Sequence, residues 1–188
     1  MSPFEAIAAL LILIAVWLVA RRSIWNYAFG AVGAAMFGWV VFDARLYSDA
    51  LLQAFFLALQ FYGWRQWSRH RAESGTVVVE MLTPRARLGW AATILVATLG
   101  WGWLMHRFTD AALPFLDALV AMVSVAAQIL LSRRKVENWG LWIAVNALSV
   151  WLYTAKQLWA FAGVYVILFA LSLWGLAKWR AAGQGAAA

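Results

Sequence analysis

Seven apolar stretches, each long enough to cross a membrane, constrain this chain of 188 residues more than any other feature. They run over residues 4–20, 24–42, 49–67, 88–105, 114–132, 139–155 and 161–178. At a rise of 1.5 Å per residue, a helix of this length spans a hydrocarbon core of about 30 Å with modest tilt. Only 12% of the residues are charged and 65% are hydrophobic, which is typical of a bilayer protein. We therefore predict an all-α integral membrane protein with seven transmembrane helices.

The first three and the last three stretches resemble each other at an offset of 112 residues. The matching positions are Arg21-Arg22 with Arg133-Arg134, Trp39 with Trp151, Gly63 with Gly175, and Trp67 with Trp179. A single helix between two triplets makes both run in the same direction, so we predict parallel repeats in a 3+1+3 arrangement. The predicted units are a first repeat over 1–67, a cytoplasmic loop and linker helix over 68–113, a second repeat over 114–180, and a flexible tail over 181–188. The space between the triplets is the natural place for a pore.

The basic residues predict the orientation of these helices. Twelve of the 15 fall on one side of the predicted membrane, namely Arg21, Arg22, Arg65, Arg69, Arg71, Arg85, Arg87, Arg133, Arg134, Lys135, Lys178 and Arg180. Only Arg45, Arg107 and Lys156 fall on the other. Because short cytoplasmic loops are enriched in Lys and Arg, the N-terminus is expected outside and the C-terminus in the cytoplasm. This asymmetry also accounts for the net charge of +7 without a nucleic-acid partner.

Several functional classes do not fit the sequence. The chain has no cysteine, and its two histidines, His70 and His106, fall on opposite sides of the predicted membrane. We therefore predict no metal site, no cofactor and no enzymatic activity. A retinal-binding receptor would need a lysine in the middle of its last helix, whereas Lys178 lies at the end of that stretch. An assembly protein without a substrate remains the alternative to a carrier.

Polar side chains form one stripe on each of three predicted helices, at spacings of three and four residues. The stripes are Asp49, Gln53, Phe56 and Gln60; then Asp117, Ala121, Ser124 and Gln128; and finally Trp142, Asn146, Ser149, Tyr153 and Lys156. Polar groups within a bilayer usually face the interior of a helix bundle, where they either bind a solute or hold helices together. For the combined set we favour a shared binding cavity. Asp49 and Asp117 lie near outer helix ends, where they cap the helix or line an entrance.

Tryptophan is unusually frequent, with 14 copies, and we expect two roles for it. Trp142 precedes Asn146 by one helical turn, which places a flat ring beside an amide and suits a heteroaromatic substrate. A cationic ring would add a cation–π attraction of roughly 0.5–2 kcal/mol. The tryptophans at the ends of spans are predicted to be interfacial anchors instead. These are Trp25, Trp64, Trp67, Trp90, Trp139, Trp174 and Trp179.

The chain resembles the PnuC family of vitamin-precursor transporters, which are related to the SWEET and SemiSWEET sugar carriers. The resemblance extends from about Arg21 to Arg180. It is carried by Trp25, Gly30, Leu52-Gln53, Tyr62-Gly63-Trp64, Trp67, Glu137-Asn138-Trp139, Trp142-Ile143, Asn146, Leu152-Tyr153, Lys156, Trp174-Gly175 and Trp179.

This resemblance implies facilitated uptake of nicotinamide riboside through a bacterial inner membrane, drawn forward by a cytoplasmic kinase that feeds NAD synthesis. Thiamine or riboflavin uptake by the same fold is the alternative. It also implies that Gln53, Gln128, Trp142 and Asn146 match substrate-contacting positions, to which we add Asp49, Asp117, Ser124 and Tyr153 from the stripes. A homo-oligomer is compatible with so small a membrane unit.

Overall fold

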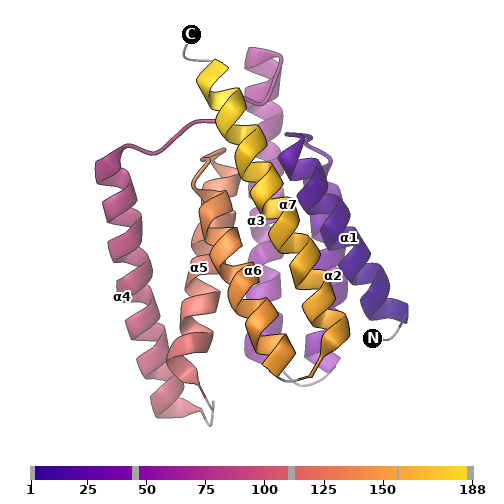
Figure 1. Ribbon diagram of the computed structural model, residues 1–188, viewed down its shortest axis with the longest axis vertical. Helices are drawn as coiled ribbons and strands as arrows, with labels where there is room; N and C mark the ends of the chain where they lie inside the picture. Colours follow the sequence, from indigo (N-terminus) through magenta and orange to yellow (C-terminus); the bar gives the residue numbers. More distant parts are fainter. Residues whose placement is uncertain (1–2, 44–46, 110–112, 156, 186–188) are drawn as a thin grey trace.

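The computed structural model describes residues 3–43, 47–109, 113–155 and 157–185, and within them the chain forms seven α-helices (Figure 1). The helices are α1 (Pro3–Ala20), α2 (Asn26–Asp43), α3 (Tyr47–Ser74), α4 (Pro84–Phe108), α5 (Pro114–Ser132), α6 (Asn138–Ala155) and α7 (Trp159–Gly185). The predicted all-α, seven-helix architecture is confirmed. The two ends of the chain lie at opposite ends of the bundle, as an odd number of crossings requires.

Two helices extend further than the apolar stretches predict. α3 continues past Trp67 to Ser74, and α7 continues past Lys178 to Gly185. The helical backbone satisfies its own hydrogen bonds, so it can leave the apolar layer wherever good helix formers follow. The predicted loop over 68–87 is therefore shorter than expected and begins at Gly75, whose φ of +71° ends α3. The predicted tail is likewise helical through Gly185.

Six of the helices form a closed ring in the order α1, α2, α3, α5, α6, α7, with α7 packed back against α1. The fourth, α4, packs against α5 only and stands at the edge of the bundle (Figure 1). We call α1–α3 the first unit and α5–α7 the second unit. The two units meet through α1 with α7 and through α3 with α5. These two contacts exchange when each helix of one unit is replaced by its counterpart in the other.

Local contacts repeat at the same offset of 112 residues as the sequence. The ring of Tyr27 meets Trp67 edge-on at 5.2 Å and 89°, and Trp139 meets Trp179 at 5.6 Å and 89°. Asn26 and Asn138 each donate to a backbone oxygen three residues earlier, both at 2.6 Å. The sequence repeat therefore corresponds to equivalent packing in the two units.

Glycine makes the same close approach in both units. A Cβ on Gly63 would lie 2.3 Å from the Tyr27 ring, and one on Gly175 would lie 2.5 Å from the Trp139 ring. No side chain fits at such distances without moving a buried aromatic ring. The paired glycines, which the sequence offset singled out, are thus explained by packing.

A buried cluster joins the two units at the end of the bundle that carries most of the basic residues. This basic-end cluster consists of Val19, Ala20, Tyr27, Trp67, Val77, Val79, Leu131, Val136, Trp139 and Trp179. Two matching hydrogen bonds cross between the units here. Trp67 Nε1 donates to the Leu131 oxygen at 3.2 Å, and Trp179 Nε1 donates to the Val19 oxygen at 3.1 Å.

The cluster corrects part of the tryptophan prediction. Trp67, Trp139 and Trp179, predicted as interfacial anchors, are at most 1% exposed. Their positions at span ends are shared with true anchors, but the facing unit covers them. Trp25, by contrast, is 60% exposed, as an anchor should be.

Four of the seven helices, α1, α4, α5 and α7, are long and apolar enough to cross a membrane by hydropathy alone. The others are less apolar on average because α2 is rich in glycine, while α3 and α6 carry amides, tyrosines and tryptophans. Such residues suit helices that face a bundle interior. The helices that fall short of the hydropathy threshold therefore include two of the three that carry the predicted polar stripes.

Candidate functional site

A layer of polar side chains lies two helical turns from the basic-end cluster. Counting seven residues along each helix from Trp67, Leu131, Trp139 and Trp179 leads to a polar residue in every case. The four residues reached are Gln60, Ser124, Asn146 and Ser172. At 1.5 Å per residue, this layer is about 10 Å deeper in the bundle than the cluster. Four helices of the ring therefore contribute polar groups at a similar depth.

Asn146 anchors this layer on α6. It is 4% exposed, and its Nδ2 donates to Ser172 Oγ on α7 at 3.1 Å. Ser172 Oγ in turn donates to the Leu168 oxygen at 2.8 Å. This chain holds the Asn146 amide in one orientation and leaves its Oδ1 as an acceptor with no hydrogen bond among the described residues.

Gln128 on α5 is buried but has no side-chain hydrogen bond within the described part of the chain. The residue is 7% exposed, yet its amide atoms are not among the fully enclosed polar atoms that lack partners. An unpartnered amide in an apolar setting costs free energy unless water or a solute satisfies it. Gln128 therefore has unused capacity to donate to and accept from a ligand.

Trp142 and Tyr153 extend the α6 stripe on either side of Asn146. Trp142 is half-buried, which leaves part of the indole accessible for stacking. Tyr153, towards the other end, stacks against Tyr165 at 5.2 Å and against Phe161 at 5.6 Å. Both stacks are close to parallel, with interplanar angles of 17° and 22°. The stripe thus offers flat aromatic surfaces at two depths, separated by the amide of Asn146 and the buried hydroxyl of Ser149.

On α3, the two predicted amides lie against glycines of α2. A Cβ on Gly30 would lie 2.7 Å from Gln60 Nε2, and one on Gly38 would lie 3.2 Å from the Gln53 Cβ. Both glutamines are half-buried. The α2 glycines therefore make room for polar side chains, in addition to allowing close helix packing.

The two predicted carboxylates differ from the amides. Asp117 lies in the first turn of α5 and is exposed. A carboxylate there is stabilised by the free N–H groups of the helix start, which accounts for the residue without a ligand. Asp49 lies within α3, and its side chain is outside the described residues.

Two polar residues of α7 were missed by the sequence interpretation. Tyr165 stacks on Tyr153, and Ser172 bonds to Asn146. The repeat offset would have found both, because Tyr165 is the counterpart of Gln53 and Ser172 is the counterpart of Gln60. Applying the offset to polar residues, as well as to Trp, Gly and Arg, was the unused signal.

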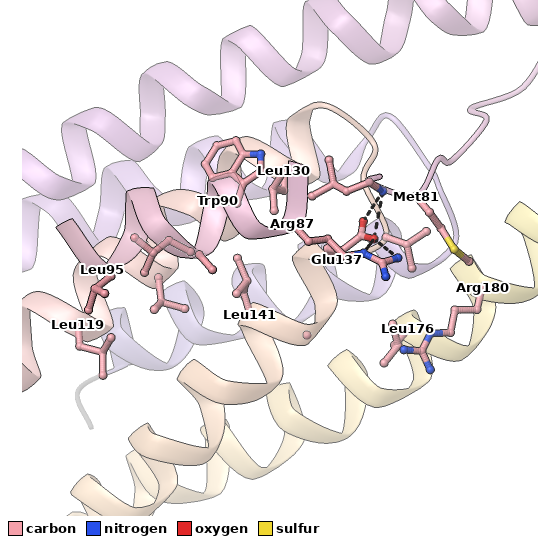
Figure 2. Close-up of a pocket in the computed structure, with 16 residues that line it drawn as sticks. Met81, Arg87, Trp90, Leu95, Leu119, Leu130, Glu137, Leu141, Leu176 and Arg180 are labelled. Carbon is pink, nitrogen blue, oxygen red and sulfur yellow. Dashed lines mark hydrogen bonds and ion pairs between the residues drawn. The ribbon is translucent and has the colours of Figure 1, made fainter. Parts of the chain in front are cut away.

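A separate groove of about 620 Å³ runs between α4 and the second unit (Figure 2). Its walls are mainly apolar side chains, including Leu95, Leu119 and Leu141. Arg87 and Glu137 form an ion pair of 2.8 Å at one end of it. None of the predicted substrate residues lines this groove. It offers no amide to a hydrophilic solute and has the character of a lipid-facing surface.

Comparison with known proteins connects this arrangement to transport. Residues 2–181 match the sequence model of the nicotinamide mononucleotide transporter family. The nicotinamide riboside transporter PnuC of Escherichia coli K12 is 29% identical over 95% of this chain and 85% of its own length. The riboflavin/roseoflavin transporter RibM of Streptomyces davaonensis is 34% identical over 85% of this chain and 76% of its own length. A crystal structure of the vitamin B3 transporter PnuC superimposes with a TM-score of 0.82 at 27% identity, covering 97% of this chain and 82% of that one.

Proposed function

Because the chain belongs to the nicotinamide mononucleotide transporter family, we propose that it carries nicotinamide riboside into the cell. The observation that carries this choice is the pair of unused amide functions at Gln128 and Asn146 on neighbouring helices, with Trp142 one turn away. A pyridinium ring can stack on Trp142, while the amides hydrogen-bond the carboxamide and the ribose hydroxyls. Gln53, Ser124 and Tyr153 line the path further out.

The absence of charge among these residues favours the nucleoside over its phosphate. Gln53, Gln128, Trp142 and Asn146 are all uncharged. A phosphate carries at least one negative charge at neutral pH, and burying it without a cation is strongly unfavourable. We therefore expect nicotinamide mononucleotide to bind at least about tenfold more weakly than nicotinamide riboside.

Transport proceeds by alternation between the two units, which we treat as parallel repeats of the kind found in SWEET carriers. The basic end faces the cytoplasm, in keeping with the distribution of Lys and Arg. The substrate moves down its gradient and is trapped by phosphorylation in the cytoplasm. The equivalent aromatic contacts at Tyr27–Trp67 and Trp139–Trp179 support a two-unit mechanism.

Riboflavin is the second candidate, because the relative RibM is 34% identical to this chain. Thiamine, another cationic heteroaromatic vitamin, completes the comparison. Calorimetric titration of the purified protein with nicotinamide riboside, nicotinamide mononucleotide, riboflavin and thiamine in parallel tests the assignment. We expect saturable heat with nicotinamide riboside and the weakest response with the mononucleotide. Tighter binding of riboflavin or thiamine would reassign the substrate, and no binding of any would favour an assembly role.

A further inference from the structure

The loop between α3 and α4 crosses the basic end of the bundle and packs into it. Val77 and Val79 are 4% and 3% exposed and belong to the basic-end cluster. We call residues 76–82 the strap. Its alternating valines lie against both units, so the strap covers the place where the units must part if a solute is to leave by this end.

The strap is bound to the second unit along most of its length. Its backbone pairs with the turn between α5 and α6, where Glu80 N donates to the Arg134 oxygen at 3.1 Å and Val136 N donates to the Glu80 oxygen at 2.9 Å. Three further contacts hold it: the Glu80–Lys135 ion pair, Arg134 Nε to the Val78 oxygen at 3.2 Å, and the Glu137 carboxylate to Leu82 N at 3.1 Å.

The strap is bound to the first unit much more lightly. Within the described residues, one hydrogen bond joins them, from Arg22 Nη1 to the Val77 oxygen at 3.2 Å. Arg22 and Arg134 occupy equivalent places in the two units, with φ values of 57° and 59° at the ends of α1 and α5. The same arginine position therefore makes one contact out of many in the second unit and the only polar contact in the first.

The closed basic end also leaves polar atoms unsatisfied. Tyr27 Oη and Trp139 Nε1 are enclosed in the cluster without a hydrogen-bond partner. They occupy equivalent positions in the two units, and each would gain water if the units separated. The cluster is thus closed but not fully satisfied, as a joint that opens repeatedly requires.

We propose that the strap moves as part of the second unit, and that the cytoplasmic end opens where the strap meets the first unit, at the Arg22 contact. Opening breaks this bond together with the two bonds that cross between units, Trp67 to Leu131 and Trp179 to Val19. The proposal deepens the proposed carrier function by naming the surface that separates.

The chain has no cysteine, so a single Ser132→Cys reports on opening. Ser132 is 0% exposed and lies close to Tyr27. We would measure its modification by a membrane-impermeant maleimide in lipid nanodiscs, without substrate. Arg22→Gln should speed modification at least about fivefold, the scale of losing a charge-assisted hydrogen bond. The matched control, Arg134→Gln, should change the rate by less than about twofold, because the backbone pairing still holds the strap. Equal effects of the two variants would overturn the proposal.

A disulfide between strap and second unit tests the same idea without removing the Arg22 contact. Glu80 and Lys135 are paired across an isolated β-bridge, a spacing that suits Glu80→Cys with Lys135→Cys. Oxidation should leave the labelling of Ser132→Cys within about twofold of the reduced protein, because the joined parts already move together. Labelling that stops on oxidation and returns on reduction would show that the strap leaves the second unit, and would refute the proposal. Neither assay depends on substrate identity, so failure of the substrate assignment is distinguished from failure of this one.

Discussion

Single residues of the α6 stripe determine how the site would read a solute. Trp142→Ala and Asn146→Leu should each weaken binding by roughly 1–3 kcal/mol, the scale of losing base stacking or stranding a polar partner. Titration of the folded variants measures this. Trp151→Ala is the matched control, since Trp151 is on the same helix but 60% exposed, and it should bind within a few-fold of wild type. Wild-type affinity in both site variants would mean that these residues only hold the bundle together.

The paired glycines give a second residue-level prediction. Gly63→Ala and Gly175→Ala each force a methyl group against a buried ring, at 2.3 Å and 2.5 Å respectively. Overpacking of this kind costs about 1–3 kcal/mol, so the melting temperature in detergent should fall for both. Gly89→Ala on α4 meets nothing within 4 Å and should leave the melting temperature unchanged. Unchanged melting in the paired variants would show that the rings can move aside.

At the scale of elements, the strap is held partly by charge. The hydrogen bond from Lys135 holds the pKa of the Glu80 carboxyl below its usual value. A lowered carboxyl pKa means that this contact stabilises the fold above about pH 4.3, the unfolded value, and is lost as the pH falls through the folded pKa. Because the Glu80 side chain is 48% exposed, its contribution is at most about 1 kcal/mol.

Glu80→Gln should therefore lower the free energy of unfolding slightly at pH 7 and have no effect near pH 3. Thermal unfolding of both proteins across this range provides the measurement. Glu73→Gln, at the exposed end of α3, serves as the control. A difference that persists at acid pH would assign the effect of Glu80→Gln to packing instead of charge.

At the scale of the whole molecule, the distribution of basic residues predicts topology. A reporter fused after Arg180 should be active in the cytoplasm, and one inserted in the loop over 43–48 should report from outside. The basis is the twelve-to-three division of Lys and Arg between the two sides. Reporting from the same side at both positions would contradict the seven-helix crossing pattern.

The sequence by itself determined the helices, their order and the repeat. Long apolar stretches identified all seven helices, and the offset of 112 residues marked positions that prove equivalent, such as Gly63 with Gly175. Periodicity also placed Asn146 and Gln128 on buried faces. These features follow from local rules, because helix period and span length are written along the chain.

Only the tertiary structure decided which apolar side chains face protein and which face lipid. Trp67 and Trp25 both stand at span ends, yet one is fully buried and the other is 60% exposed. The strap valines, Val77 and Val79, sit in a polar loop and gave no sign that they would complete a cluster between two units. The physical reason is that a lipid tail and a protein interior are equally apolar. Hydrophobicity therefore predicts membrane insertion, whereas the partner of each side chain depends on how the units pack.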